Sequence, residues 1–228
     1  MRYLVSTEMN REGSRFPPTL SAAATPMQSD ESSEILAAGR FLRLVRRGTW
    51  EYAERVHPRP AVVIVAVTSA GELVLVEQFR VPLQARVIEL PAGLVGDIPG
   101  DDHPDPRTHA RRELLEETGF RAGRVKRLFG GPVSAGFGTE TVEFFLATGL
   151  HQVGPGGGVE GEQIDVHLVP LNQVESWLKR RTRRDRLADP KIFAGLYFAR
   201  QVVDAGSKEP ASTQHANSRR GQRRTKGG

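Results

Sequence analysis

The chain has 228 residues, of which 38% are hydrophobic and none is cysteine. This length and apolar content suit one globular domain of moderate size with tails. No apolar run approaches the roughly 20 residues of a membrane span, and the first residues lack the order typical of a signal peptide. Without cysteine there are neither disulfides nor thiolate chemistry, which is compatible with a reducing cytoplasm, where we expect the protein.

The net charge of +5 is concentrated at the C-terminal end. Residues 206–228 contain six Lys or Arg and one Glu, which gives 6 − 1 = +5, so residues 1–205 sum to zero. The segment is rich in Gly, Ser, Gln and Asn, a composition typical of a disordered tail. We interpret it as a solubilising extension, with weak contact to nucleic acid as the alternative.

The N-terminal part of the chain changes character near Ile35. Residues 1–33 mix proline with Ser, Thr and Ala without a sustained period, which predicts a flexible arm. Met27 is therefore an alternative start to Met1, and the intact mass of the natively expressed protein distinguishes the two. Residues 34–58 form an N-terminal strand region, with strands predicted at 41–45 and 50–56.

Residues 59–205 alternate between strand and helix patterns. Residues 61–67 are continuously apolar, as expected for a strand covered on both faces. The sequence predicts further strands at 72–80, 87–90, 125–129, 142–148 and 164–169. It predicts helices at 106–118, 171–181 and 190–205. Strands on both sides of a central helix, with another helix at the end, predict a mixed α/β sandwich.

The first of these helices has clear ends and an acidic face. Asp105 and Pro106 suit the N-cap and first helical positions, and Gly119 suits the left-handed position after the last turn. Three glutamates near the C-terminal end are spaced i, i+3 and i+4, so they share one face. They repel one another unless a cation joins them; a solvated charged face is the alternative interpretation.

A strand that ends at Pro91-Ala92-Gly93 precedes this helix. The loop that follows would place free backbone carbonyls beside the helix carboxylates. Carboxylates, a carbonyl oxygen and waters form the octahedral site that Mg²⁺ prefers, with room left for phosphate oxygens. Such a site suits cleavage of a phosphoanhydride.

Residues 93–120 resemble the signature of the Nudix hydrolases, G-x5-E-x7-R-E-U-x-E-E-x-G-U, in which U is a bulky apolar residue. The second half matches fully from Arg112 to Phe120. The first half departs from the pattern, because Gly93 lies nineteen residues before Arg112 where the signature has fourteen. Pro104 occupies the place of the expected glutamate, and either Asp101 or Asp102 is a candidate substitute.

Two neighbouring segments resemble the ADP-ribose pyrophosphatase branch of this family. These are Glu-Gln-Phe-Arg at 77–80 and Glu-Leu-Pro-Ala-Gly-Leu at 89–94. Members of this branch hydrolyse nucleoside diphosphates linked to sugars. The resemblance extends over about residues 39–205 and implies a Nudix-type α/β/α sandwich with a mixed sheet.

The resemblance also implies which residues hold the metal, Mg²⁺ or alternatively Mn²⁺. The ligands would be the Ala92 carbonyl, Glu113 and Glu117, with Glu116 close behind. Arg112 would orient the glutamates by pairing across the helix.

Arg80 would grip the diphosphate, because its guanidinium fork suits phosphate oxygens. For Glu89 three roles stay open: a second metal, a ribose hydroxyl or local pairing. In related enzymes a glutamate on a mobile loop activates water. Here Glu162 ends a glycine-rich loop before the 164–169 strand and is favoured over Glu160.

Three residues of the early strands resemble the base-binding region of this branch. Trp50 would stack on adenine, with Glu51 beside it, and Arg55 would contact phosphate or ribose. A core tryptophan is the alternative. In the family this contact often crosses a homodimer interface, so we expect a homodimer. Glu140 is a further substrate-contact candidate, whereas Ala135 replaces a proline that marks ADP-ribose enzymes.

The sequence thus predicts a homodimeric Mg²⁺-dependent hydrolase of nucleoside diphosphate sugars. ADP-ribose, cleaved to AMP and ribose 5-phosphate, is the preferred substrate. ADP-glucose and GDP-mannose are alternatives within the same class. A non-catalytic nucleotide-sensing or RNA-binding module is the alternative from a different class.

Overall fold

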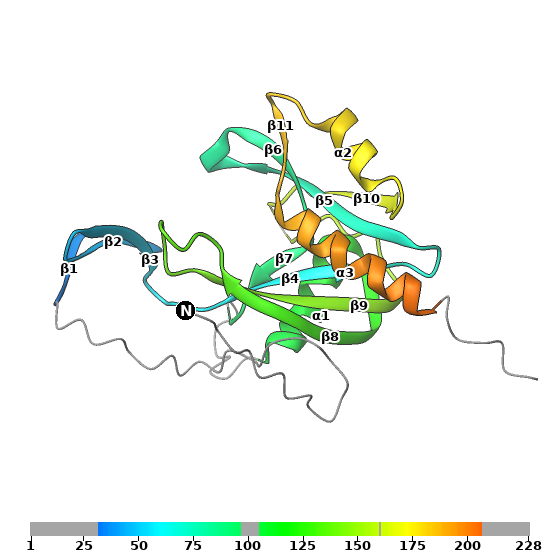
Figure 1. Cartoon of the computed structure of the whole chain (residues 1–228), viewed down its shortest axis with the longest axis horizontal. Coiled ribbons are helices and arrows are strands. Elements are labelled where there is room, and N and C mark those ends of the chain that lie inside the picture. The colour runs from blue at the N-terminus through cyan, green and yellow to red at the C-terminus, as the bar shows by residue number, and fades with distance from the viewer. Residues whose placement is uncertain (1–31, 97–104, 160, 207–228) are drawn as a thin grey trace, which may run out of the picture.

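The computed structural model describes residues 32–96, 105–159 and 161–206 of the chain, the last five by backbone only. Figure 1 shows a three-stranded sheet that projects to one side of a larger body. The body contains two four-stranded sheets and the helices. No helix in the described part of the chain is long and apolar enough to cross a membrane.

The projecting sheet is an antiparallel meander in the order β1-β2-β3. Its strands are β1 (Ser33–Ala38), β2 (Leu42–Arg47) and β3 (Trp50–Arg55). Gly48, with φ +56°, makes the turn between the last two strands. The two predicted strands of this region are confirmed, whereas β1 was not predicted because its short Ala-rich run has no clear alternation.

The first sheet of the body is mixed and has β4 near its centre. β4 pairs in parallel with β9 and antiparallel with β7, and β8 pairs antiparallel with β9. The sheet order is β7-β4-β9-β8. The strands are β4 (Ala61–Ala66), β7 (Ala92–Leu94), β8 (Phe120–Pro132) and β9 (Thr141–Gln152).

The second sheet of the body has the order β10-β5-β6-β11. β11 runs parallel to β6, and the other two pairings are antiparallel. A short 3-10 turn, η1 (Val81–Leu83), joins β5 to β6. The strands are β5 (Glu72–Arg80), β6 (Ala85–Glu89), β10 (Asp165–Pro170) and β11 (Arg186–Ala188).

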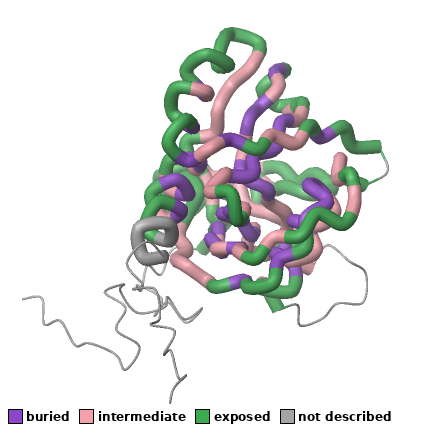
Figure 2. The backbone as a smooth tube through the Cα atoms, turned by 90° about the vertical axis from the view of Figure 1, so that its right-hand side faces the viewer, coloured by how far each residue is buried: buried purple, intermediate pink, exposed green. Residues whose placement is uncertain are grey.

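Helices cover the sheets from different sides (Figure 1). They are α1 (Pro106–Thr118), α2 (Val174–Arg181) and α3 (Lys191–Gly206). Alternate residues of β4 enter two separate cores; Figure 2 shows in purple the buried segments of the chain. Val63 packs in the core that contains residues of α3, and Val62 in the core that contains residues of α1. The predicted sandwich, and the strand covered on both faces, are therefore confirmed.

The helix ends agree with the sequence interpretation of α1. The Asp105 side chain accepts a hydrogen bond from the Arg107 amide at 3.2 Å, and the Gly119 amide donates to the Leu115 carbonyl at 2.9 Å. Predicted strands 125–129 and 142–148 were too short, because β8 and β9 continue through glycines and charged or polar residues that interrupt the apolar pattern. The three-residue strands β7 and β11 are too short for a periodic signal.

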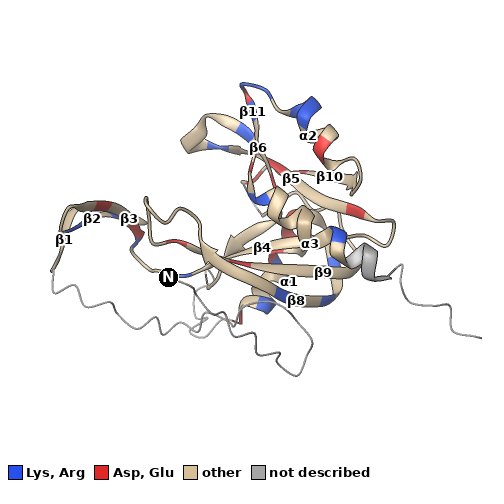
Figure 3. Cartoon of the chain, in the orientation of Figure 1, with Lys and Arg blue, Asp and Glu red and all other residues tan. Residues whose placement is uncertain are grey.

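A cluster of ion pairs around Glu77 joins all four strands of the second sheet; Figure 3 colours the acidic and basic positions of the chain. Glu77 on β5 is only 1% exposed. Its carboxylate accepts hydrogen bonds from Arg86 at 2.7 Å and Arg186 at 2.9 Å, and His167 lies 3.0 Å away. Burial alone would raise the pKa of Glu77, but Arg86, His167 and Arg186 together hold it below its ordinary value. Glu77 is therefore ionised in the folded protein.

We predict that Glu77→Gln destabilises the protein by about 3 kcal/mol or more, because it leaves the partly buried guanidinium groups of Arg86 and Arg186 without their buried counter-charge. The depressed pKa means that this stabilisation exists above the ordinary glutamate pKa and is lost as the pH falls through the folded value. Urea unfolding at neutral and acidic pH measures both effects. Glu175→Gln, which removes an exposed pair with Arg200, is the control and should change stability by less than about 1 kcal/mol. Equal losses in the two variants would contradict the prediction.

Candidate active site

The acidic face of α1 is turned toward β7 and not toward open solvent. Glu113 is 8% exposed and Glu117 6% exposed. Gly93 on β7 approaches so closely that a Cβ atom there would overlap the carboxyl group of Glu113. Glycine at this position therefore allows the strand and the carboxylate to lie in direct contact. The solvated charged face considered from the sequence does not describe these two residues.

Arg112 holds two of the three helix glutamates. Its guanidinium lies 2.6 Å from Glu113 Oε1 and 2.9 Å from Glu116 Oε2. The pair with Glu116 is the i, i+4 pair of neighbouring helix turns. Arg112 thus fixes the two carboxylates relative to each other, which is the arrangement that an orienting role requires.

Glu117 accepts a hydrogen bond from the Ala92 amide at 3.0 Å. Burial, together with the nearby carboxylates of Glu113 and Glu162, raises the pKa of Glu117 to about 8, against the opposing effects of the Ala92 amide and Arg80. The charges of Arg80, Glu113 and Glu162 therefore act on one buried carboxyl group. The structure thus gathers residues from β5, α1 and the loop before β10, all predicted from the sequence.

Arg80 pairs with Glu89, its neighbour on the adjacent strand β6. The guanidinium lies 2.7 and 2.8 Å from Glu89 Oε2, and the Arg80 side chain remains 41% exposed. Local pairing, one of the three roles left open for Glu89, is therefore present. Burial raises the pKa of Glu89, although Arg80 opposes the shift. The pair orients Arg80 while leaving part of its guanidinium accessible.

The glycine-rich loop before β10 contacts the end of α1. The Gly157 amide donates to the Glu117 carbonyl at 2.9 Å, and the Gly158 amide donates to the Glu116 carbonyl at 3.1 Å. Glu162 accepts a hydrogen bond from the Val159 amide at 3.0 Å. The sequence interpretation placed Glu162 at the end of this glycine-rich loop but missed the bonds of the loop to the helix. Glu160, Asp101, Asp102, Met27 and the segments 1–31 and 207–228 lie outside the described residues.

The donor atoms suit a hard divalent ion without forming a complete cage. Among the described residues, no group of three or more His, Cys, Asp or Glu side chains is arranged to hold a metal by itself. Glu113 and Glu117 nevertheless supply buried carboxyl groups, and Glu116 lies beside them, joined to Glu113 by Arg112. Mg²⁺ commonly takes only one or two carboxylates and completes its shell with waters and substrate phosphates. The carboxylate set therefore fits this ion, whereas a ligand role for the Ala92 carbonyl stays a prediction.

The predicted base-binding residues lie elsewhere, on the projecting sheet. Trp50 is 64% exposed, so the alternative of a core tryptophan is wrong. It lines an open hollow of about 420 Å³ together with Arg47 and Tyr52. Tyr52 was missed, although Trp50 and Tyr52 alternate along β3 and so share one face of the strand.

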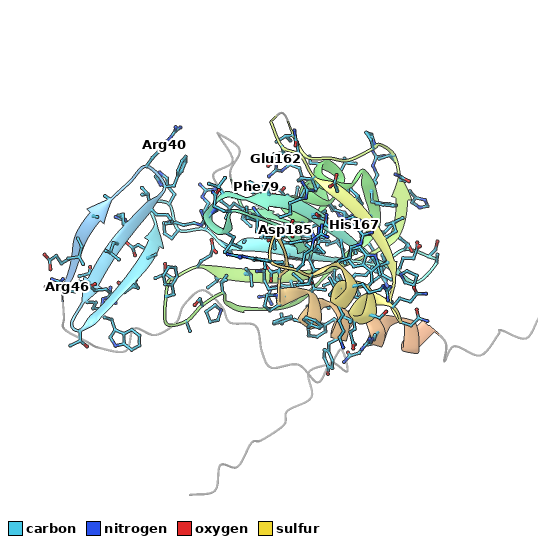
Figure 4. The ribbon with its side chains drawn as sticks, turned by 90° about the horizontal axis from the view of Figure 1, so that it is seen from above. Arg40, Arg46, Phe79, Glu162, His167 and Asp185 are labelled. Carbon is cyan, nitrogen blue, oxygen red and sulfur yellow. The ribbon has the colours of Figure 1, made fainter. Side chains whose placement is uncertain are left out.

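The other residues predicted for substrate contact are engaged in ion pairs. Glu51 pairs with Arg46 at 2.7 Å, and Arg55 pairs with Glu140 at 2.5 Å. Figure 4 shows the projecting sheet, with Arg46 labelled, set apart from Glu162. Within one chain, the structure therefore does not bring Trp50 and Glu51 together with the carboxylates of α1.

Comparison with known proteins relates this chain to a family and to named relatives. A model of the NUDIX domain matches residues 57–190. The chain is 30% identical over 173 residues to the methanol dehydrogenase activator of Bacillus methanolicus, which covers 73% of this chain and 89% of that protein. It is 34% identical over 133 residues to the GDP-mannose pyrophosphatase of Escherichia coli K12, which covers 55% and 66% of the two chains.

Further matches concern ADP compounds. The chain is 39% identical over 94 residues to the ADP-ribose pyrophosphatase of Bacillus subtilis, covering 41% of this chain and 48% of that protein. The alignments thus span less than two thirds of these two pyrophosphatases. A crystal structure of an ADP compounds hydrolase superposes with a TM-score of 0.60 at 20% identity, over 78% of this chain and 95% of the other, and shows the same fold. Because the family model covers more than half of the chain, the protein belongs to the Nudix family.

Proposed function

We propose that the protein hydrolyses the diphosphate bond of nucleoside diphosphate sugars with the help of Mg²⁺. The observation that carries the proposal is the buried carboxyl group of Glu117, whose pKa is shifted by the nearby charges of Glu113, Arg80 and Glu162. A buried carboxyl with acidic neighbours becomes fully ionised when a cation joins the group. A diphosphate also needs a cation to neutralise its negative charge, so one ion would neutralise both the protein carboxylates and the substrate.

Each residue would have a separate task in this reaction. Glu113 and Glu117, with Glu116 and the Ala92 carbonyl, would hold the ion. Bound Mg²⁺ supplies charge neutralisation on phosphate oxygens and lowers the pKa of water. Arg80, oriented by Glu89, would bind the diphosphate in bidentate fashion. Glu162 would accept the proton of the attacking water.

ADP-ribose is the substrate that we favour, with AMP and ribose 5-phosphate as products. The named relatives support the class, since they include both ADP-ribose and GDP-mannose pyrophosphatases. GDP-mannose is therefore the main alternative, and Ala135, in place of the marker proline, weakens the preference for ADP-ribose. We place the reaction in the cytoplasm, consistent with a chain without cysteine.

The exposed aromatic hollow supports a homodimeric enzyme. Trp50 and Tyr52 offer a stacking surface for a base, yet their sheet projects away from the carboxylates of α1 (Figure 1). In a homodimer, this sheet would supply the base contact to the site of the partner subunit. Arg55 and Glu140 would border that contact.

A second candidate function is activation of a dehydrogenase. The alignment with the methanol dehydrogenase activator covers 89% of that relative, more than the alignments with the named pyrophosphatases. A nicotinamide dinucleotide also contains a diphosphate bond, so the same carboxylates could act on a dehydrogenase cofactor. Including NAD among the tested substrates separates this candidate from the first.

We predict that the purified protein with Mg²⁺ or Mn²⁺ releases nucleoside monophosphate from at least one of ADP-ribose, ADP-glucose, GDP-mannose and NAD. Product identification by chromatography checks this. Glu117→Gln should lower kcat by about 100-fold or more, because the metal-binding charge is lost. Glu175→Gln, on the surface pair with Arg200, should keep full turnover. No release from any of the four compounds would overturn the proposed hydrolase.

We predict that the metal-free protein loses stability as the pH rises from about 4.5 to about 8. The folded pKa of Glu117 is raised to about 8, so the folded state binds more protons than the unfolded state in this window. Thermal unfolding in chelator measures the slope. Glu117→Gln should reduce it, making the variant more stable than the wild type near pH 8. Saturating Mg²⁺ should reverse that order, and an unchanged slope in the variant would contradict the prediction.

We predict that deletion of residues 207–228 leaves turnover unchanged, since all the proposed site residues lie within residues 50–162. The deletion removes all of the net charge of +5, so any salt-dependent affinity for nucleic acid should fall. Steady-state kinetics and a filter-binding titration check the two outcomes. If the deletion abolishes turnover but leaves the affinity for nucleic acid intact, the result contradicts both the prediction for the enzyme and the alternative of a tail-dependent binding module.

A further inference from the structure

Three consecutive glycines form an unusual cap on α1. We name Gly156, Gly157 and Gly158 the glycine clamp. The last carbonyls of a helix have no partner within the helix. Here the clamp supplies two of these partners, because the amides of Gly157 and Gly158 donate to the carbonyls of Glu117 and Glu116. These are backbone groups of two of the three glutamates on the acidic face.

Two of the three clamp glycines, Gly156 and Gly158, lie too close to their neighbours for a side chain. A Cβ atom at Gly156 would lie 2.7 Å from the carbonyl oxygen of Glu117 and nearer still to Thr118. At Gly158 a Cβ would lie 2.5 Å from Glu162 Oε2. Both glycines also have positive φ, +67° and +88°. The clamp therefore contacts the helix on one side and Glu162 on the other.

The same segment also holds Glu162. Val159, the residue after the clamp, donates its amide to the Glu162 carboxylate at 3.0 Å, and the Glu162 amide donates to the Val159 carbonyl at 3.0 Å. The Ile164 amide donates a hydrogen bond to the Gly157 carbonyl at 3.3 Å. A short series of bonds thus connects the Glu117 backbone to the Glu162 side chain. Figure 4 shows where Glu162 lies relative to the body of the protein.

We propose that the glycine clamp is a positioning element that sets the place of Glu162 relative to Glu117. Through its hydrogen bonds, the clamp connects the C-terminal end of the proposed metal-binding helix to the short segment that carries the Glu162 carboxylate. The inference rests on the proposed function, because position matters only if both carboxylates act in the reaction. It identifies Gly156 and Gly158 as positioning residues. A displacement of about 1 Å in a reacting group can cost 100-fold in rate.

The first test compares single added methyl groups. Gly156→Ala and Gly158→Ala should each lower kcat by about tenfold or more and change KM by less than about threefold, because the substrate-binding Arg80 is untouched. Gly154→Ala places a methyl in open space in the same loop, and Gly71→Ala places one in open space at a positive φ of +75°, remote in the β4–β5 turn. Both controls should keep kcat within about twofold. Equal loss in Gly71→Ala and Gly156→Ala would overturn the proposal.

The second test separates positioning from simple destabilisation by a double-mutant cycle. Glu162→Gln should lower kcat strongly in the wild type but only weakly in the Gly158→Ala background, because Glu162 is already displaced there. Additive losses would overturn the positioning role while leaving the hydrolase proposal intact. If the wild type turns over no substrate, the proposed function fails and the positioning role fails with it. If Gly156→Ala does not fold, Gly158→Ala still decides, since its methyl mainly meets a flexible side chain.

Discussion

The arrangement of this site depends on one physical constraint, the burial of carboxyl groups beside a strand end. Glu117 and Glu113 are nearly inaccessible to solvent, and an ionised carboxylate loses favourable hydration when it is buried. The protein offsets this cost only in part. Arg112 forms a salt bridge with Glu113, and the Ala92 amide donates a hydrogen bond to Glu117. The pKa of Glu117 nevertheless rises to about 8. The remaining deficit of positive charge is the physical argument for a cation at this place.

The fold supplies the close contacts that this constraint needs. β4 is buried on both faces, so it fixes α1 on one side and α3 on the other. β7 pairs with β4 through Ala92 and Val63, which brings the Ala92 amide to the Glu117 carboxylate. The signature residues are therefore assembled by ordinary sheet pairing and core packing.

The sequence alone predicted the parts of this arrangement that depend on local patterns. The caps of α1, the doubly covered β4 and the grouping of Arg80, Glu113 and Glu162 with Glu117 follow from spacing and from resemblance. The contacts of Gly157 and Gly158 with α1 were missed, because a glycine run has no periodicity and its backbone bonds are long-range. The residues of the enlarged loop, such as Asp101, lie outside the described part, so their role stays a prediction.

A comparison of two buried glutamates shows why only one of them suggests chemistry. Glu77 is the less exposed, yet two arginines and a histidine surround it, and its pKa is lowered. Its charge is stabilised by these partners, so the residue joins strands and needs no added cation. Glu117 has one arginine nearby and two carboxylates, and its pKa is raised. Burial is common to both residues; the sign of the local charge balance is what distinguishes a carboxylate already neutralised by its protein partners from one that suits an added cation.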